Sequence, residues 1–364
     1  MTKTAIRKTT LPKHVLAQCV SLLALAAFAG CGSSATGDSV APSAPTTPNL
    51  AALGTTRTWI RLLQRPAHNP YAPLVAAKLQ RTWFLPPGKL KQHELLYITQ
   101  WTYGPVLIYD VSGKKLDPKP VGSISAAAHD AAVDQKGYLY LSLYNQIARY
   151  APGKSKPTLY EPDPNGVSDG VAVADDGTVY MADDHNVLVY EHGRTKPSYT
   201  IPNPAPSYGT PLDVAVDASG NAYVPIATEG ASPIYEFAPG SIYGNQLPIE
   251  NDWGAVFDEV DPQGNLILSN IGFTNIGGGM GPSIQAFRPG QGQPFATFDT
   301  GNYPGRIVLN HDANALFVED VTPTSTFVVD EYAYPNGELL RTLSPSKSGL
   351  NLPYGLAISP RAPI

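Results

Sequence analysis

Between residues 131 and 269 the chain repeats one pattern of apolar and polar positions four times. Each copy has an alternating apolar strand, a turn with a glycine, and a second alternating strand, which is typical of a β-hairpin. The copies are AAVDQKGYLYLS (131–142), VAVADDGTVYMA (171–182), VAVDASGNAYVP (214–225) and DEVDPQGNLILS (258–269). This region is therefore predicted to be a series of hairpins.

Weaker copies extend the series on both sides, at 308–319 and, for the second strand only, at 94–100. One apolar position in each second strand recurs every 40 to 50 residues, at Tyr97, Tyr140, Tyr180, Tyr223, Ile267 and Phe317. A second hairpin with a Pro- or Gly-containing turn follows each copy, which gives four strands per unit. Six such units predict an all-β fold over residues 93–364, a six-bladed β-propeller with four-stranded blades.

The C-terminal end of the repeat region has an extra strand, and the N-terminal end lacks one. The segment 352–362 (LPYGLAISPRA) aligns with the first strand of a unit, whereas the unit around Tyr97 lacks that strand. We predict that Leu356 to Ser359 supply the innermost strand of the first blade. The C-terminal strand then closes the ring and removes a free sheet edge.

The first 30 residues have the pattern of a bacterial export signal. A basic segment precedes an apolar stretch of 14 residues (15–28), which is too short to span a bilayer comfortably. The stretch ends in Phe28-Ala29-Gly30-Cys31, which resembles the bacterial lipobox, with Phe28 where leucine is usual. The resemblance implies a signal peptide over 1–30 and lipidation of Cys31. The alternative is an ordinary secretory signal that leaves Cys31 as an incidental thiol.

Residues 31–56 are rich in Ser, Ala, Thr and Pro and predict a flexible tether, whereas residues 57–92 form a lead-in segment without a clear pattern. Gly32 directly after the cysteine, by the same resemblance, implies sorting to the outer membrane. We therefore expect a lipid-anchored protein of the bacterial cell envelope, in the outer membrane or on its extracellular face.

Charge and cysteine usage narrow the possible partners. The net charge is −5, and no basic stripe occurs beyond the extreme N-terminus, which argues against nucleic acid as a partner. Cys19 and Cys31 are the two cysteines, so the propeller has neither a disulfide nor a Cys-ligated zinc. We expect a monomer that is stabilised by packing alone.

The stretch DGVAVADDGTVYMADDHNVLVYEHG resembles the NHL repeat, with Asp183 and Asn186 at the Asp and Asn positions of that family. At repeat level the resemblance covers residues 94 to 362. It implies a propeller but no particular activity, because this architecture supports binding modules, lyases and lactonases.

Propellers usually bind ligands at the mouth of the central channel, beside the residues that lead into each first strand. The repeat alignment places His129, Asp169, Arg306 and Tyr354 at one equivalent position. Asp130 and Asp213 follow one residue later in their units. Together they predict a polar pocket for an anionic or sugar-like ligand. The alternative is that they satisfy turn backbone and channel water.

The segment Ser168 to Val173 also resembles the gluconolactonase segment PDGLAVD, which implies that Asp169 binds a divalent metal such as Ca²⁺ and helps to activate water. The other ligands of that family are not found at the equivalent blade entries, where His129 and Arg306 stand instead. We therefore favour a non-enzymatic surface lipoprotein that binds a protein, peptide or glycan. The alternative is a metal-dependent lactonase, hydrolase or lyase that acts at Asp169.

Two further motifs are interpreted as structural. The run Asp183-Asp184-His185-Asn186 lies between two alternating strands, where Asp and Asn commonly form turns. The glycine-rich run 277–281 lacks the Lys-Ser/Thr of a phosphate-binding loop and is predicted to be a hairpin tip in the fifth blade.

Overall fold

The computed structural model describes residues 93–359, apart from 101–103, 114–118, 165–167, 184, 208, 229–231, 250–253, 271–280, 325, 345–347 and 351. The chain divides into two units, Met1–Pro66 and Ala67–Ile364, and all described residues belong to the second. The predicted signal peptide, Cys31, the tether and the lead-in segment lie outside the described residues.

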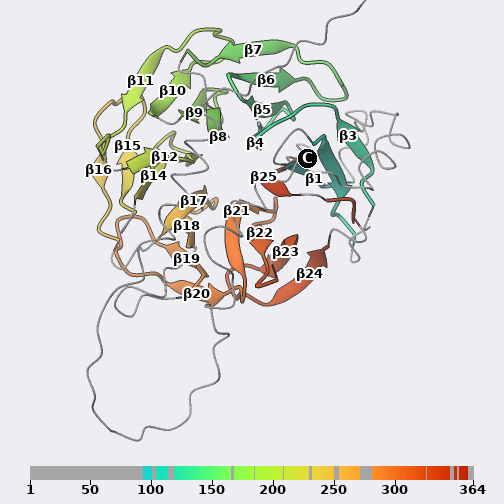
Figure 1. Ribbon diagram of the computed structural model, residues 1–364. Helices are drawn as coiled ribbons and strands as arrows, with labels where there is room; N and C mark the ends of the chain where they lie inside the picture. Colours follow the sequence, from blue (N-terminus) through green and yellow to red (C-terminus); the bar gives the residue numbers. More distant parts are fainter. Residues whose placement is uncertain are drawn as a thin grey trace, which may run out of the picture. The chain divides into compact units, whose positions relative to one another are not determined.

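Six antiparallel sheets surround a central channel as the blades of a propeller (Figure 1). From the channel outward, blade 1 contains β25 (Pro353–Ile358), β1 (Leu95–Gln100), β2 (Val106–Asp110) and β3 (Gly122–Ile124). Blade 2 contains β4 (Asp130–Val133), β5 (Leu139–Leu143), β6 (Gln146–Tyr150) and β7 (Leu159–Pro162). Blade 3 contains β8 (Ser168–Val173), β9 (Val179–Asp183), β10 (Asn186–Tyr190) and β11 (Tyr199–Pro202).

The other three blades follow the same plan. Blade 4 has a divided inner strand and contains β12 (Gly209–Pro211) and β13 (Ala215–Val216), then β14 (Ala222–Thr228), β15 (Ile234–Phe237) and β16 (Asn245–Gln246). Blade 5 contains β17 (Ala255–Val260), β18 (Leu266–Asn270), β19 (Ser283–Phe287) and β20 (Ala296–Asp299). Blade 6 contains β21 (Tyr303–Leu309), β22 (Ala315–Val321), β23 (Phe327–Ala333) and β24 (Leu339–Leu343). Among the described residues, no helix is long and apolar enough to cross a membrane.

The predicted repeat is confirmed residue by residue. The recurring apolar position falls in the second strand of every blade, and its side chain is at most 6% exposed in all six. The turn between the first and second strands is built in the same way in several blades. In blade 2, for example, Asp134 Oδ1 accepts from the amides of Lys136 and Tyr138, while Gly137 has a φ of +81°. An L side chain rarely adopts that φ, which explains the glycine.

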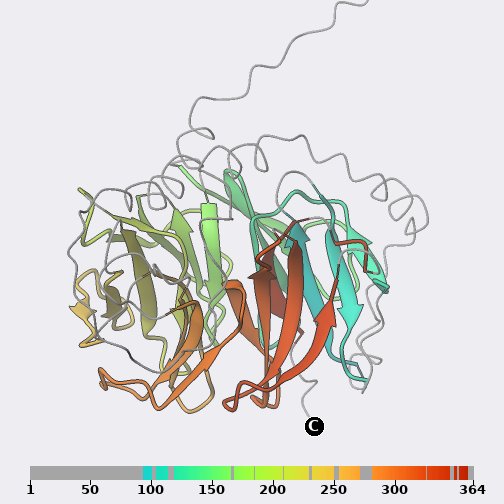
Figure 2. The ribbon, with the colours of Figure 1, turned by 60° about the horizontal axis from the view of Figure 1, so that its bottom comes forward.

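The predicted closure of the ring is also confirmed. Strand β25 pairs antiparallel with β1, so that Ala357 lies opposite Tyr97. Ser359 adds two hydrogen bonds of 2.8 Å, because its amide donates to the carbonyl of Leu95 and its Oγ accepts from the amide of Leu95. The strand begins earlier than predicted, at Pro353. The first blade is therefore joined from both ends of the propeller segment, as Figure 2 shows from another side.

The run that begins at Asp183 forms a turn, as predicted. Asp183 Oδ1 accepts from the amides of His185 and Asn186, each at 2.6 Å. The expected hairpin tip at 277–280 lies outside the described residues.

Candidate functional site

The six inner strands run in the same direction along the channel. We call the end at which they begin the strand-start end, and the end at which they turn into the second strands the turn end. The residues predicted from the repeat alignment lie toward the strand-start end. They occupy the first two positions of β4, β8 and β25, the fourth position of β21, or the residues just before β4 and β13.

Arg306 lies at the centre of these residues. Its Nη1 is 3.0 Å from Asp130 Oδ2 and 2.5 Å from Asp213 Oδ1, and its Nη2 donates to the carbonyl of Leu212 at 3.2 Å. Arg306, Asp130 and Asp213 are only 2%, 4% and 6% exposed. Ion pairs between three different blades therefore block the channel at this level.

Aromatic rings and a second charge pair complete the cluster. The guanidinium of Arg306 lies 4.7 Å from the ring centroid of Phe257 and 5.5 Å from that of Tyr354, which are cation–π distances. His129 packs edge-on against Tyr354, with 6.1 Å between ring centroids, and its Nδ1 is 3.5 Å from Asp169 Oδ1. The structure thus brings all six predicted residues together. We call His129, Asp130, Asp169, Asp213, Arg306 and Tyr354 the ion cluster.

Backbone irregularities place these side chains. The register of the inner strand shifts between Ser168 and Val171, between Pro304 and Ile307, and opposite the Ile98–Gln100 segment. A β-bulge breaks the alternation of side chains and redirects them. Asp169, Arg306 and Tyr354 therefore point where a regular strand would not direct them.

Two glycines make room for the two aspartates that bind Arg306. Asp130 Oδ2 accepts from the amide of Val171 in the next blade at 3.0 Å. In the preceding blade, a Cβ on Gly355 would lie 2.5 Å from the Cα of Asp130, and one on Gly170 would lie 2.7 Å from the Cα of Asp213. Each aspartate thus needs a neighbouring blade without a side chain at that position.

In three blades a hydroxyl group joins the blade to the next one beside the cluster, and these three residues were not among the predicted site residues. Thr99 Oγ1 donates to the carbonyl of His129, Ser142 Oγ to that of Ser168, and Ser269 Oγ to that of Pro304, at 2.8 to 3.0 Å. Each hydroxyl residue stands two positions after the recurring apolar residue, so the repeat alignment carried this signal. In blade 6 the equivalent residue is Glu319, which is 4% exposed.

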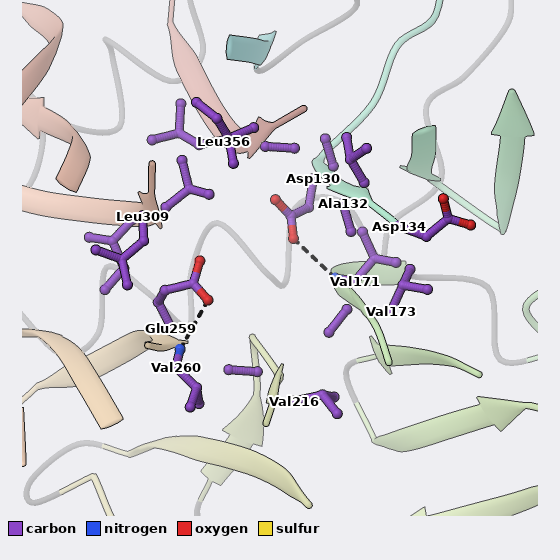
Figure 3. A pocket seen from close by; sticks show the side chains of 18 of the residues that line it. Asp130, Ala132, Asp134, Val171, Val173, Val216, Glu259, Val260, Leu309 and Leu356 are labelled. Carbon is purple, nitrogen blue, oxygen red and sulfur yellow. Dashed lines mark hydrogen bonds between the residues drawn. The ribbon is translucent and has the colours of Figure 1, made fainter. Parts of the chain in front are cut away.

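At the turn end the channel opens into a cavity of about 830 Å³ (Figure 3). Asp130, Asp213, Asp258 and Arg306 line its inner part, and Glu259 projects into it. Short aliphatic side chains line its walls, including Ala132, Val171, Val173, Val216, Val260, Leu309 and Leu356. Exposed residues form its rim, including Gln135, Lys136, Asp175 and His311.

Asp258 and Glu259 were not among the predicted site residues, although they differ from the equivalent residues of the other repeats. The fifth unit has DEVD where three others have AAVD, VAVA and VAVD, so an acidic pair replaces small or apolar residues. Asp258 is 6% exposed, and neither of its carboxylate oxygens makes a hydrogen bond of normal geometry, although the nearby amide of Ala215 favours its charged form. Glu259 Oε1 accepts from the amide of Val260 at 2.9 Å.

Burial dominates the electrostatics of this region. It raises the pKa of Asp130 and of Glu259 to about 7, although Arg306 counteracts it at Asp130. Burial and the neighbouring Asp213 raise the pKa of Asp258 well above its usual range. Burial disfavours the charged form of His129, but the Asp169 carboxylate outweighs it and raises the pKa of the imidazole. The inner channel therefore holds more acidic groups than its one arginine can neutralise.

The surroundings of Asp169 do not fit a calcium ion. Within the described part of the chain, no three His, Cys, Asp or Glu side chains are arranged so that they could hold a metal. A calcium ion takes six to eight oxygen ligands, whereas Asp169 faces an imidazole and lies close to Arg306. The structure therefore adds no support to metal chemistry at Asp169.

Comparison with known proteins supports the fold and leaves the function open. No protein-family profile matches the chain, and no curated protein matches it. Among solved structures, Kuenenia stuttgartiensis hydrazine synthase is similar at 16% identity and a TM-score of 0.47, over 57% of this chain and 63% of that chain. The match thus spans less than two thirds of the synthase chain. A Bacteroides caccae protein of unknown function is similar at 10% identity and a TM-score of 0.54, over 74% of this chain and 99% of that chain.

The match to the Bacteroides caccae protein, at an identity this low, shows a shared fold alone. The NHL resemblance stays a prediction from the repeat sequence.

Proposed function

We propose that this protein is a lipid-anchored binding module of the bacterial cell envelope, and that its propeller takes a small ligand, or a short segment of a partner, into the channel cavity. The observation that carries the proposal is the form of the channel, which is blocked by the ion cluster at one end and hollow at the other. Binding sites are concave, mostly apolar, and carry a few convergent polar groups.

The walls of the cavity support binding rather than a purely structural channel. Ala132, Val173, Val216 and Val260 are only half-buried, although they belong to the inner strands of a closed ring. Apolar surface that a fold leaves uncovered in a pocket is available to a ligand. The rigid frame of six blades keeps this surface in place without a ligand.

Methyl-resolved NMR of the full-length protein tests the location. A library of soluble amphipathic fragments is expected to shift the methyl signals of Val173, Val216, Val260, Leu309 and Leu356. Leu339 and Leu340 provide a matched control, because they are 53% and 45% exposed on the outer strand β24 and report non-specific adsorption. Equal shifts on β24, or no shifts in the channel, would contradict the proposal.

The membrane anchor rests on the lipobox resemblance at Cys31 and is tested separately. Cells fed a radiolabelled fatty acid are expected to label the wild-type protein but not Cys31→Ser. Absence of label on the wild type would remove the anchor from the proposal and leave channel binding untouched.

The alternative function, a calcium-dependent lactonase centred on Asp169, makes a different prediction. It requires stoichiometric calcium that is lost in Asp169→Ala, together with a calcium-dependent rise of the melting temperature. We expect neither, because among the described residues no three His, Cys, Asp or Glu side chains are arranged to hold a metal, and Asp169 faces the imidazole of His129.

A further inference from the structure

We infer that the channel cavity binds an organic cation, a molecule with an ammonium group and an apolar body, and that Glu259 receives the ammonium group. The inference rests on the proposed function, because it names the chemical class of the ligand for the same cavity.

Charge within the cavity points to a cation. Its described lining contains six Asp or Glu side chains, and among the Lys and Arg residues only Lys136 at the rim and Arg306 at the inner end. Arg306 is already bound by Asp130, Asp213 and the carbonyl of Leu212. Its Nη atoms are therefore committed to these groups. At pH 8, above its pKa of about 7, Glu259 carries a negative charge that neither Arg306 nor Lys136 pairs with.

The environment of Asp258 also indicates a cationic ligand. Asp258 lines the cavity and is 6% exposed, and neither of its carboxylate oxygens makes a hydrogen bond of normal geometry, although the amide of Ala215 lies close enough to favour the charged form. Such a group is unfavourable in a folded protein unless something satisfies it. An ammonium group bound at Glu259 would bring positive charge close enough to Asp258 to favour its ionised form.

Glu259 is placed to make the direct contact. Its carboxylate projects into the open space of the cavity, whereas Asp130 is turned toward Arg306 and the amide of Val171 (Figure 3). The amide of Val260 holds Oε1 of Glu259 at 2.9 Å. This hydrogen bond orients the carboxylate, and a carboxylate oxygen can accept more than one.

The walls of the cavity indicate the chemical character of the rest of the ligand. Val173, Val216, Val260 and Leu309 lie between the rim and the acidic inner end. They favour an alkyl or aromatic body rather than a highly charged polyamine. A metal ion fits less well, because the described residues offer no group of three metal-ligating side chains.

Isothermal titration calorimetry on the full-length protein tests the inference with three probes of equal length: n-hexylammonium, n-hexanol and hexanoate. At pH 8 we expect hexylammonium to bind at least ten-fold more tightly than hexanol, and hexanoate to bind most weakly. Glu259→Gln is expected to weaken hexylammonium at least ten-fold and to leave hexanol unchanged.

Glu161→Gln is the matched control. Glu161 is 1% exposed, burial raises its pKa to about 7 as at Glu259, and it lies on the outer strand β7 of blade 2. We expect this variant to bind all three probes as the wild type does. If Glu259→Gln does not fold, the order of the three probes on the wild-type protein decides the question.

The possible failures are distinguishable. If hexanol or hexanoate binds as tightly as hexylammonium, the channel still binds ligands but the cation assignment is overturned. If none of the three probes binds, channel binding itself fails, and with it both the inference and the proposed function.

Discussion

The two ends of the central channel are built from the inner strands of the same six blades, but they differ in charge pairing and in open volume. At the strand-start end, the ion cluster joins blades 2, 4 and 6 through Arg306, which is 2% exposed. At the turn end, the same strands carry short aliphatic residues and leave a cavity of about 830 Å³. The comparison shows how one repeated strand can close a channel at one end and keep it open at the other.

Acidic groups occur in both regions, but they are compensated differently. Asp130 and Asp213 contact a guanidinium and backbone amides. Asp258 makes no hydrogen bond of normal geometry, and Glu259 contacts only the backbone amides of Val260 and Leu309. The carboxylates at the strand-start end therefore stabilise the fold through ion pairs, and those toward the cavity are available to a ligand.

The largest effect is expected from Arg306→Met, which removes the centre of the ion cluster. Loss of one partner from a buried ion pair costs about 3–5 kcal/mol, because the remaining charges stay buried without compensation. Urea unfolding at pH 7.5 measures the change. Arg194→Met is the control, because Arg194 pairs with Glu191 at the surface, and it should change the stability little. Equal stabilities of both variants would mean that the cluster does not hold the blades together.

Gly355→Ala should have the next largest effect. The new methyl group would meet backbone and side-chain atoms of Asp130 at about 2.5 Å, so strand β25 must move at the point where the ring closes. Overpacking of this kind costs about 1–3 kcal/mol. Gly281→Ala, where nothing lies within 4 Å, is the matched control. A melting temperature of Gly355→Ala equal to that of the control would show that the contact relaxes without cost.

The dependence of stability on pH reports on the buried carboxylates of both ends of the channel. Burial raises the pKa of Asp130 and Glu259 to about 7 and that of Asp320 to about 8. Between about pH 5 and 8 the folded protein thus binds protons that the unfolded chain has released, so its free energy of unfolding falls as the pH rises. Glu259→Gln should reduce this slope and raise stability at pH 8 by about 1 kcal/mol. Stability that increases over this range would contradict the assignment.

The smallest effect is expected at the rim of the cavity. Lys136 is exposed, so Lys136→Ala should leave the melting temperature nearly unchanged. Its removal takes one positive charge from the mouth and should strengthen hexylammonium binding slightly, more at low than at high salt. Weaker binding in this variant would show that Lys136 contributes to the site.

The fold could be predicted from the sequence because a propeller repeats one local pattern. The alternation and the turn glycines, such as Gly137, report strand and turn positions without knowledge of distant contacts. Closure by β25 was also predictable, because one unit lacked the strand that the C-terminus supplied. The divided inner strand of blade 4, β12 and β13, was not predictable from alternation, because the apolar alternation of VAVD (214–217) matches that of the undivided inner strands.

The candidate site was only partly predictable. Alignment of the repeats selected Arg306 and its neighbours, because equivalent positions in a ring face one another. The alignment did not predict that Arg306 forms ion pairs with Asp130 and Asp213, because a β-bulge determines the direction of the Arg306 side chain. Glu259 was not predicted, because site residues were expected at the strand-start end, whereas the cavity opens at the turn end.

A crystal structure of the full-length protein with 6-bromohexylammonium tests the central claim most directly, because bromine can be located by its anomalous signal. The account predicts one peak inside the cavity, among the side chains of Val173, Val216 and Val260, with the ammonium nitrogen within hydrogen-bond distance of Glu259. A peak found only on the outer strands, or beside His129 and Asp169 at the strand-start end, would contradict it.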